Sequence, residues 1–292
     1  MATHSVKSYR RAPSTLALMA RAAVTGIPGL SSIPGIRRDG RGLPDLVVRR
    51  PDQPIDLGHL AAYNRLCGFG LQATVPVTYP HVLAFGLQLA LLTDRRFPFP
   101  ALGLVHVHNS ITQLRPVQTS ERLDLEVGAA NLRPHPRGRQ FDVVTTARVQ
   151  GSVVWAELTT LLRRGSGHPT GQRDKPAPLP PSPVEWRLPV DLGRRYAAVS
   201  GDRNPIHLYA ITARPFGFHR QIAQGMWSLA RCLAGLAGRL PATYTVEAKF
   251  SKPILLPADV AYTTTMHDEV VRFALADARE GTPHVSGLVT PG

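Results

Sequence analysis

The residues most suited to chemistry are concentrated in the segment SGDRNPIHLYAITARPFGF, residues 200–218. An acid, Asp202, and a base, His207, stand five positions apart, with Asn204 between them. A carboxylate and an imidazole in one pocket can remove a proton at one centre and return a proton at another. For an isolated pair, a simpler interpretation is a polar loop in which Asp202 caps a turn and His207 packs on the protein.

Two other kinds of site fit this segment poorly. A metal site needs three or four ligands of suitable geometry, and only His219 follows nearby, without a supporting Cys or Glu. A Ser-His-Asp triad needs a nucleophile on a sharp turn, but the chain has no G-x-S-x-G motif and nothing marks Ser200 as activated. We therefore expect neither a metal nor a cofactor.

The composition is that of a globular protein with a sizeable core. The chain has 292 residues, 43% of them hydrophobic, which is enough for one large domain or two small ones. The run LALMARAAV at 16–24 is too short to span a membrane, is interrupted by Arg21 and lacks a clean cleavage site, so we expect a retained N-terminal extension. The two cysteines, Cys67 and Cys232, are expected to be reduced thiols in a cytoplasmic protein.

The chain is strongly basic. Its net charge is +14, and residues 1–50 contain nine basic residues against two acidic ones. The sequence has no zinc-ligand spacing and no RNA-binding aromatic motif, so we expect no nucleic-acid partner. The charge permits a phosphate-bearing ligand but does not show one. The loop GIPGLSSIPG at 26–35 lacks the Lys-Ser/Thr ending of a phosphate-binding P-loop.

The two halves of the chain resemble each other. Tyr63 and Gly68 are five residues apart, as are Tyr196 and Gly201, and the two pairs are offset by 133 positions. Each pair closes a short helical pattern. A stretch rich in Gly and Pro at 163–186 lies between the halves and is typical of a linker.

Each half then continues with a long apolar helix and a set of strands. The helices are predicted at 81–92 and 222–240, and both are apolar on nearly every face, so each should be buried. Alternating apolar residues follow in both halves and predict antiparallel strands. The fold class is therefore α+β, with a sheet curled round a helix in each half. The two sheets could pair edge to edge.

The segment around Asp202 carries a family resemblance. The order and spacing of YAAVSGDRNPIH, Ala213, the Gly217-Phe218 pair and IAQGM at 222–226 resemble the hydratase-2 motif of MaoC-like (R)-specific enoyl-thioester hydratases and dehydratases, as does AKFSKPILLP at 248–257. With its degenerate first half, the whole chain is similar to the two-hotdog members from mycobacteria. The resemblance implies a double hotdog fold and a hydro-lyase that reversibly dehydrates (3R)-3-hydroxyacyl thioesters in fatty-acid metabolism.

The resemblance also implies roles for individual residues. Asp202 and His207 would be the acid/base pair, and the amide of Gly225 would bind the thioester oxygen. The expected supporting residues are Asn204, Ser200 and Gly201, and the acyl-tunnel candidates are Phe69 and Met226. The chain departs from the family pattern in two places. Tyr209 stands where an acidic residue is usual, and Gln224 replaces the histidine of an HGM sequence.

The resemblance predicts one active site per chain. Laying Gly68 on Gly201 puts Phe69 opposite Asp202 and Thr74 opposite His207, so the first half lacks the acid/base pair. We expect a basic extension at 1–50, a degenerate hotdog at 51–163, a linker at 164–183 and a catalytic hotdog at 184–292.

The expected substrate is an acyl thioester of CoA or acyl carrier protein, bound by a homodimer or by a monomer of two hotdog units. Two alternatives stay open at this point. One is a non-catalytic acyl-binding or scaffold subunit of a hotdog complex, and the other is a hotdog thioesterase, which uses the same fold with different acids.

Overall fold

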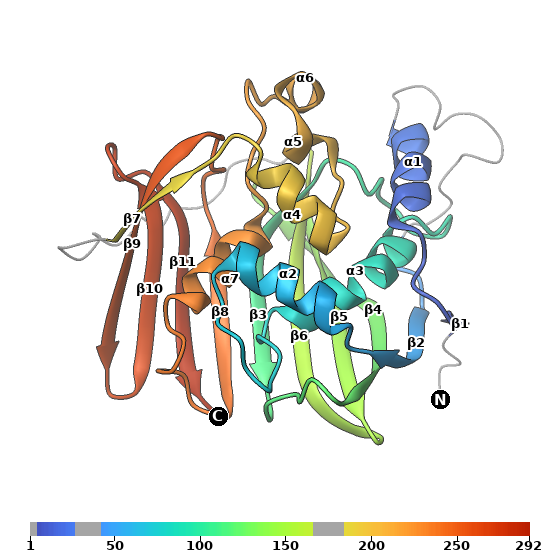
Figure 1. Ribbon diagram of the computed structural model, residues 1–292. Coiled ribbons are helices and arrows are strands. Elements are labelled where there is room, and N and C mark those ends of the chain that lie inside the picture. The colour runs from blue at the N-terminus through green and yellow to red at the C-terminus, as the bar shows by residue number, and fades with distance from the viewer. Residues whose placement is uncertain (1–4, 27–41, 166–183) are drawn as a thin grey trace.

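The computed structural model describes residues 5–26, 42–165 and 184–292 (Figure 1). The elements of the first half are β1 (Ser5–Ser8), α1 (Thr15–Gly26), β2 (Leu46–Pro54), α2 (Leu57–Cys67), α3 (Tyr79–Leu92), β3 (Leu104–Gln113), β4 (Arg122–His135), β5 (Gly138–Val149) and β6 (Ser152–Arg164). Those of the second half are β7 (Val184–Leu188), α4 (Leu192–Ser200), α5 (Pro205–Leu208), α6 (Ala210–Ala213), the 3-10 helix η2 (Arg214–Phe216), α7 (Gly225–Ala234), β8 (Tyr244–Phe250), β9 (Ala258–His267), β10 (Val270–Asp277) and β11 (Pro283–Pro291). The predicted linker at 164–183 and the loop at 26–35 fall almost wholly outside the described residues.

The repeat predicted from the sequence is confirmed by the order of the strands. They form one eleven-stranded sheet in the order β1-β2-β4-β5-β6-β3-β8-β11-β10-β9-β7. Strands β3 and β8 lie next to each other in this sheet, and we call their shared edge the β3–β8 seam. Apart from β1, the strands follow the same order outward from the seam in both halves: β3, β6, β5, β4 and β2 in the first half and β8, β11, β10, β9 and β7 in the second. The two halves are therefore tandem hotdog units, each a sheet curled round one helix, α3 in the first unit and α7 in the second (Figure 1).

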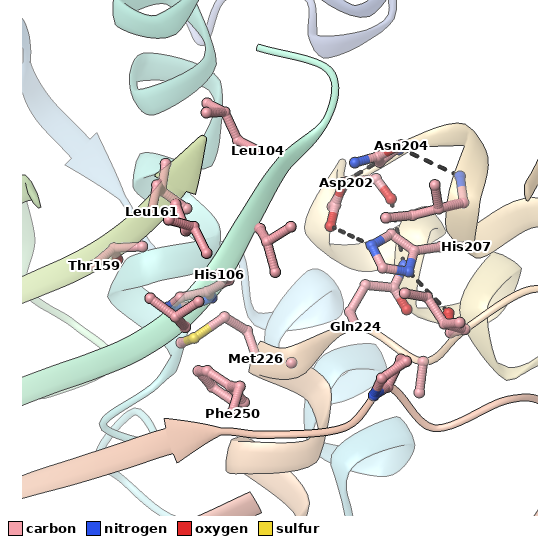
Figure 2. Close-up of a pocket in the computed structure, with 18 of the residues that line it drawn as sticks. Leu104, His106, Thr159, Leu161, Asp202, Asn204, His207, Gln224, Met226 and Phe250 are labelled. Carbon is pink, nitrogen blue, oxygen red and sulfur yellow. Dashed lines mark hydrogen bonds and ion pairs between the residues drawn. The ribbon is translucent and has the colours of Figure 1, made fainter. Parts of the chain in front are cut away.

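The edge-to-edge pairing of the two units is also confirmed. Strands β3 and β8 pair antiparallel from His108 opposite Lys249 to Gln113 opposite Tyr244. Toward its start at Leu104, β3 pairs only with β6, and its register shifts between His106 and His108. The two units therefore separate at this end of the seam, where Figure 2 shows Leu104 and His106 beside a cavity.

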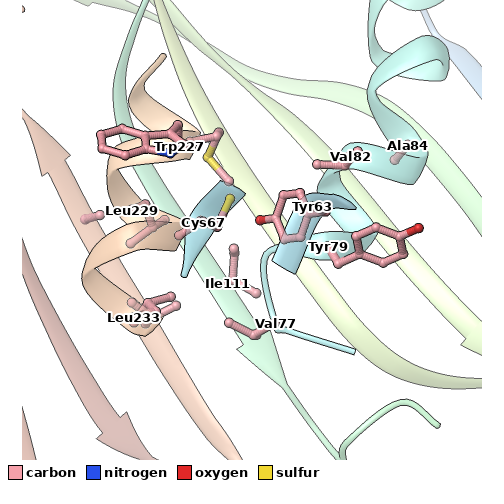
Figure 3. Close-up of a cluster of buried hydrophobic side chains, with 14 of the residues drawn as sticks. Tyr63, Cys67, Val77, Tyr79, Val82, Ala84, Ile111, Trp227, Leu229 and Leu233 are labelled. Atoms are coloured by element: carbon pink, nitrogen blue, oxygen red, sulfur yellow. The ribbon is translucent and has the colours of Figure 1, made fainter. Parts of the chain in front are cut away.

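The core lies between the sheet and the two long helices. All but three of the fourteen residues of α3 are buried, as its apolar sequence predicts. Tyr63 and Cys67 of α2 meet Trp227 and Leu229 of α7 over Ile111 of β3 (Figure 3). This cluster joins elements of both units, so the two units share one core.

The second long helix is shorter than the sequence predicted. It was expected over 222–240, but α7 begins at Gly225 and ends at Ala234. Glycines at 235 and 238 weaken the helix, and Gly238 takes a positive φ of 80° that helical residues do not adopt. The chain turns there and enters β8.

Both cysteines are free, as the sequence predicted, and both are buried. Burial raises the pKa of the Cys67 thiol to about 12. Burial likewise raises the pKa of Cys232 well above its ordinary value. Because the thiolate is the reactive form, neither cysteine is suited to nucleophilic chemistry at neutral pH.

The N-terminal residues pack on the first unit. Strand β1 pairs parallel with β2, and Lys7 forms an ion pair with the buried carboxylate of Asp94. Helix α1 packs against α3. Just before α1, the backbone of Pro13 approaches Gly86 of α3. Gly86 has no side chain, so α3 accepts this close approach.

A buried polar cluster lies between α3 and the sheet of the first unit. His81 and Gln88 are seven positions apart on α3, two helical turns, so both face the sheet. Glu157 on β6 meets them: both of its oxygens accept from His81 Nδ1 at 2.9 Å, and one accepts from Gln88 Nε2 at 3.2 Å. Asn109 on β3 donates to the same carboxylate at 2.8 Å. Burial raises the pKa of Glu157, but His81 and Asn109 outweigh burial and lower it below its ordinary value.

We expect His106, which lies close to this cluster, to make the protein sensitive to acid. Burial and the neighbouring His81 lower the pKa of His106 from 6.5 to about 3. As the pH falls from 6.5 toward 3, the unfolded chain binds a proton that the folded chain does not, so the free energy of unfolding falls. His106→Phe should make this decline shallower in urea unfolding measured across the range. The prediction would be contradicted if the free energy of unfolding fell with pH at the same rate in the wild type and in His106→Phe. It would also be contradicted if the exposed control His267→Phe made the decline shallower by the same amount.

Candidate functional site

The polar segment begins where α4 ends. Gly201 takes a left-handed conformation with φ 75° and closes the helix, just as Gly68 closes α2 with φ 87°. The Ser200 hydroxyl donates to the carbonyl of Tyr196 at 2.8 Å and accepts from the amide of Asp202 at 3.1 Å. The supporting residues Ser200 and Gly201 thus fix the direction in which the chain leaves the helix.

A single helical turn then positions His207. Asn204 caps α5: its side-chain oxygen accepts from the amide of Ile206 at 3.4 Å, and Pro205 occupies the first helical position. The carboxylate of Asp202 accepts from the amide of Asn204 at 3.2 Å. As a result, Asp202 Oδ2 lies 3.5 Å from His207 Nε2 (Figure 2).

The hydrogen bonds of His207 determine the tautomer of its neutral ring. His207 Nδ1 lies 2.8 Å from the carbonyl oxygen of Ile222, and a carbonyl can only accept, so Nδ1 carries the proton. In the neutral imidazole, Nε2 then presents a lone pair to the carboxylate. Asp202 and His207 together can therefore hold one further proton between Oδ2 and Nε2, so the pair can act as an acid and as a base.

The start of α7 completes this side of the site. As the first residue of the helix, Gly225 has no helical carbonyl partner for its amide N–H, which lies at the positive end of the helix dipole. An added Cβ at Gly225 would lie 3.1 Å from the ring of Phe250. Glycine therefore fits between the helix start and the aromatic ring, with an amide available to bind an oxygen.

Gln224, which departs from the family pattern, ties α7 to the segment with Asp202. Its amide nitrogen donates to the carbonyl of Gly193 at 3.0 Å and to that of Asp202 at 3.4 Å. Its side-chain oxygen is buried, with no hydrogen-bond partner among the described residues. Tyr209, the other departure, is 52% exposed and stacks with Arg194, so it lies away from the pair.

The site opens into a cavity of about 350 Å³ between the two units. Asp202, Asn204, His207 and Gly225 form part of its wall. Most of the remaining wall is apolar and comes from α1, α3, β3, β6 and α7: Met19, Phe85, Leu89, Leu92, Leu104, Leu161 and Met226. The cavity can therefore enclose an apolar chain beside a polar reacting group.

Met226 and Phe69, the two acyl-tunnel candidates, occupy different places. Met226 is buried and lines the cavity near Phe250 (Figure 2). Phe69 does not line it and instead stacks on Tyr63, with ring centroids 6.2 Å apart. The reason is loop length. Only residues 68–78 connect α2 to α3, whereas 201–224 connect α4 to α7, so the first loop has no counterpart of the polar segment.

The sequence did not reveal several cavity residues of the first unit. His81, Gln88, His106 and Thr159 all line the wall. Their only sequence signal is polarity at positions that the helix and strand patterns place inside the core.

Among the described ranges, no group of three or more His, Cys, Asp or Glu residues is placed to hold a metal ion. No helix among them is long and apolar enough to cross a membrane.

Comparison with known proteins shows clear similarity over almost the whole chain. A family model for the MaoC like domain matches residues 173–286. The chain is 37% identical over 281 residues to 3-hydroxyacyl-thioester dehydratase X of Mycobacterium tuberculosis, covering 95% of this chain and 98% of the relative. The crystal structure of HtdX from that organism superposes with a TM-score of 0.77 at 36% identity, covering 84% of this chain and 100% of that one. A double hotdog protein of the same organism superposes with a TM-score of 0.54 at 12% identity, over 82% of this chain and 92% of that one, and shows the fold alone.

The position of His207 depends on the absence of a side chain at Gly193. A Cβ built at Gly193 would lie 2.1 Å from the carbonyl oxygen of His207. Gly193→Ala should therefore lower the free energy of unfolding by about 1–3 kcal/mol, as overpacking does. Gly70→Ala is the matched control, because no atom lies within 4 Å of its added Cβ, and its effect should stay within about 0.5 kcal/mol. Equal stability of the two variants in denaturant unfolding would show that the loop carrying His207 moves freely.

Proposed function

The chain belongs to the MaoC-like dehydratase family, and we propose that it reversibly dehydrates (3R)-3-hydroxyacyl thioesters and hydrates trans-2-enoyl thioesters. The relative at 37% identity carries the name of such a dehydratase. The observation that carries the proposal is the Asp202–His207 pair on the wall of a largely apolar cavity, beside the Gly225 amide, which has no hydrogen-bond acceptor among the described residues. These are the groups that the reaction needs.

The reaction needs one proton removed and one supplied. In dehydration the C2–H bond breaks and its proton goes to the enzyme. The electron pair forms the C2–C3 double bond, and the hydroxyl leaves C3 as water after receiving a proton from the enzyme. Asp202 Oδ2 and His207 Nε2 lie 3.5 Å apart, so one group can accept a proton from C2 while the other donates a proton to the leaving hydroxyl. Hydration reverses each step, and the pair returns to its starting state without a cofactor.

Negative charge must be stabilised on the thioester oxygen as C2 loses its proton. A preorganised N–H at the start of a helix suits this task, because the helix dipole and the orphan amide both favour an anion. We assign the role to the Gly225 amide at the start of α7. The ring of Phe250 lies close to this residue.

The acyl chain would extend from the pair into the apolar part of the cavity. The thioester carrier, CoA or acyl carrier protein, would lie at the opening. Three basic residues contribute to the cavity wall and are exposed: Arg137, Arg164 and Lys252. Within the ranges that the structure describes, none of the ion pairs involves them, so their charge is available to phosphates or to an acidic carrier surface.

Replacing either member of the pair should abolish most of the activity. Asp202→Asn and His207→Ala should each lower kcat for hydration of a 2-enoyl-CoA by at least about 100-fold, the scale of a lost general acid or base. The loss of the enoyl absorbance measures the rate.

The chain offers a matched control for these variants. His267 and Asp268 form an exposed pair of the same residue types, with Nδ1 and Oδ2 2.8 Å apart. Asp268→Asn and His267→Ala should retain wild-type turnover. Wild-type turnover in Asp202→Asn or His207→Ala would refute the assignment, and release of free thiol in place of hydration would indicate a thioesterase.

The three exposed basic residues Arg137, Arg164 and Lys252, which we call the basic rim, should make substrate binding depend on salt. We expect KM for an enoyl-CoA to rise with ionic strength while kcat changes less, because exposed charges are screened beyond about 10 Å at 0.1 M salt. Lys252→Ala should raise KM at low salt and reduce this dependence. Arg272→Ala serves as the control, because Arg272 is exposed on β10 and does not line the cavity. A KM that is independent of salt in the wild type would exclude a role for the rim.

A further inference from the structure

The cavity contains a polar patch that the dehydration chemistry does not use. We call His81, Gln88, His106 and Thr159 the distal patch, since all four line the cavity and come from the first unit. Figure 2 shows His106 and Thr159 across the cavity from Asp202 and His207, with Leu104 and Leu161 nearby. The patch thus lies on the part of the wall where an apolar chain would pass.

A buried carboxylate holds this patch together. Glu157 has a fully buried side chain and accepts hydrogen bonds from His81, Gln88 and Asn109 at 2.8–3.2 Å. Asn109 also donates to the Thr159 hydroxyl at 3.2 Å. None of the ion pairs in the described part of the chain joins Glu157 to an Arg or Lys, so His81 is its cationic partner when protonated.

Such a network is costly in a cavity built only for an alkyl chain. Burying a polar group without a partner costs about 1–3 kcal/mol, and burying a charge costs more. Apolar residues of similar volume would pack there without this cost. Polar groups retained on the wall of an otherwise apolar cavity therefore point to a polar group on the ligand.

The hydrogen bonds already made show what the distal patch can still bind. His106 Nε2 donates to the carbonyl of His108 at 3.1 Å, which leaves Nδ1 with a lone pair. Its lowered pKa, about 3, keeps the ring neutral near pH 7, so Nδ1 is an acceptor. Gln88 uses its amide nitrogen for Glu157 and Thr145, which leaves its oxygen as a second acceptor. The Thr159 hydroxyl accepts from Asn109 and can still donate its own proton.

A group that both donates and accepts matches this set. We propose that the distal patch binds a hydroxyl group on the acyl chain, beyond the carbons that react, and that hydroxylated acyl thioesters are preferred substrates. The proposal rests on the proposed function for the identity of the acyl chain. A keto oxygen could only accept and would leave the two acceptors of the patch unpaired.

Binding of unreactive analogues tests the proposal apart from the chemistry. The probes are saturated acyl-CoA thioesters that lack the C2–C3 double bond and the C3 hydroxyl, either plain or with one hydroxyl at a series of positions along the distal chain. Calorimetry gives the ratio of Kd values for plain and hydroxylated chains of equal length. At the best position, wild type should bind the hydroxylated chain about tenfold tighter, the scale of one or two satisfied hydrogen bonds.

Two variants test whether the distal patch causes this preference. Thr159→Val is nearly isosteric, and His106→Phe keeps the ring that lies 4.5 Å from Phe250. Each should bring the ratio close to one, because each variant removes one of the groups that would bind the hydroxyl. Leu161→Val alters the apolar wall beside Thr159 and should keep the wild-type ratio.

The outcomes separate this proposal from the proposed function. A wild type without preference at any position, or a preference that persists in both patch variants, would overturn the distal patch as a hydroxyl site. If the protein hydrates no enoyl-CoA but still binds the hydroxylated chain more tightly, and loses this preference in the patch variants, the binding site is supported and the proposed dehydratase function is rejected.

Discussion

The pairing of β3 with β8 is the constraint on which the rest of the structure depends. It joins the two units into one sheet, but it extends only from His108 and Lys249 to Gln113 and Tyr244. Where the pairing stops, the units separate and the cavity forms between them. Asp202 and His207 line the cavity from the second unit, and the distal patch lines it from the first. A seam that paired over the full length of β3 would leave no such space.

The candidate site itself is assembled by backbone contacts over short distances. The carbonyl of Ile222 fixes the proton on His207, and the carbonyl of Gly193 holds Gln224 at the start of α7. Gly193 therefore braces both the histidine loop and the residue before Gly225. The hydrogen bonds of Gln224 also show how the chain accommodates a glutamine at this position, since its side-chain amide donates to the carbonyls of Gly193 and Asp202 without carrying charge.

The sequence predicted the parts of this protein that depend on local pattern. The repeated Tyr–Gly pairs revealed the duplication, because Gly68 and Gly201 both close helices in the left-handed conformation. The motif placed Asp202 and His207 in one short loop, and the structure brings their side chains within 3.5 Å. Phe69 was assigned to the cavity because an ungapped alignment cannot show that one loop is shorter than the other. The cluster around Glu157 was missed because α3, β3, β5 and β6 each contribute to it, and only the fold brings them together.

The duplication has a consequence for how such a protein can evolve. In a symmetric dimer of single units, every substitution appears twice, so a change that improves one surface also alters its copy. In the tandem chain each position is encoded once. The α2–α3 loop could shorten to residues 68–78 while the α4–α7 loop kept its polar segment, and α3 could acquire His81 and Gln88 while α7 kept Gly225. Selection can therefore act on the cavity wall in one half of the gene without disturbing the proposed catalytic residues in the other.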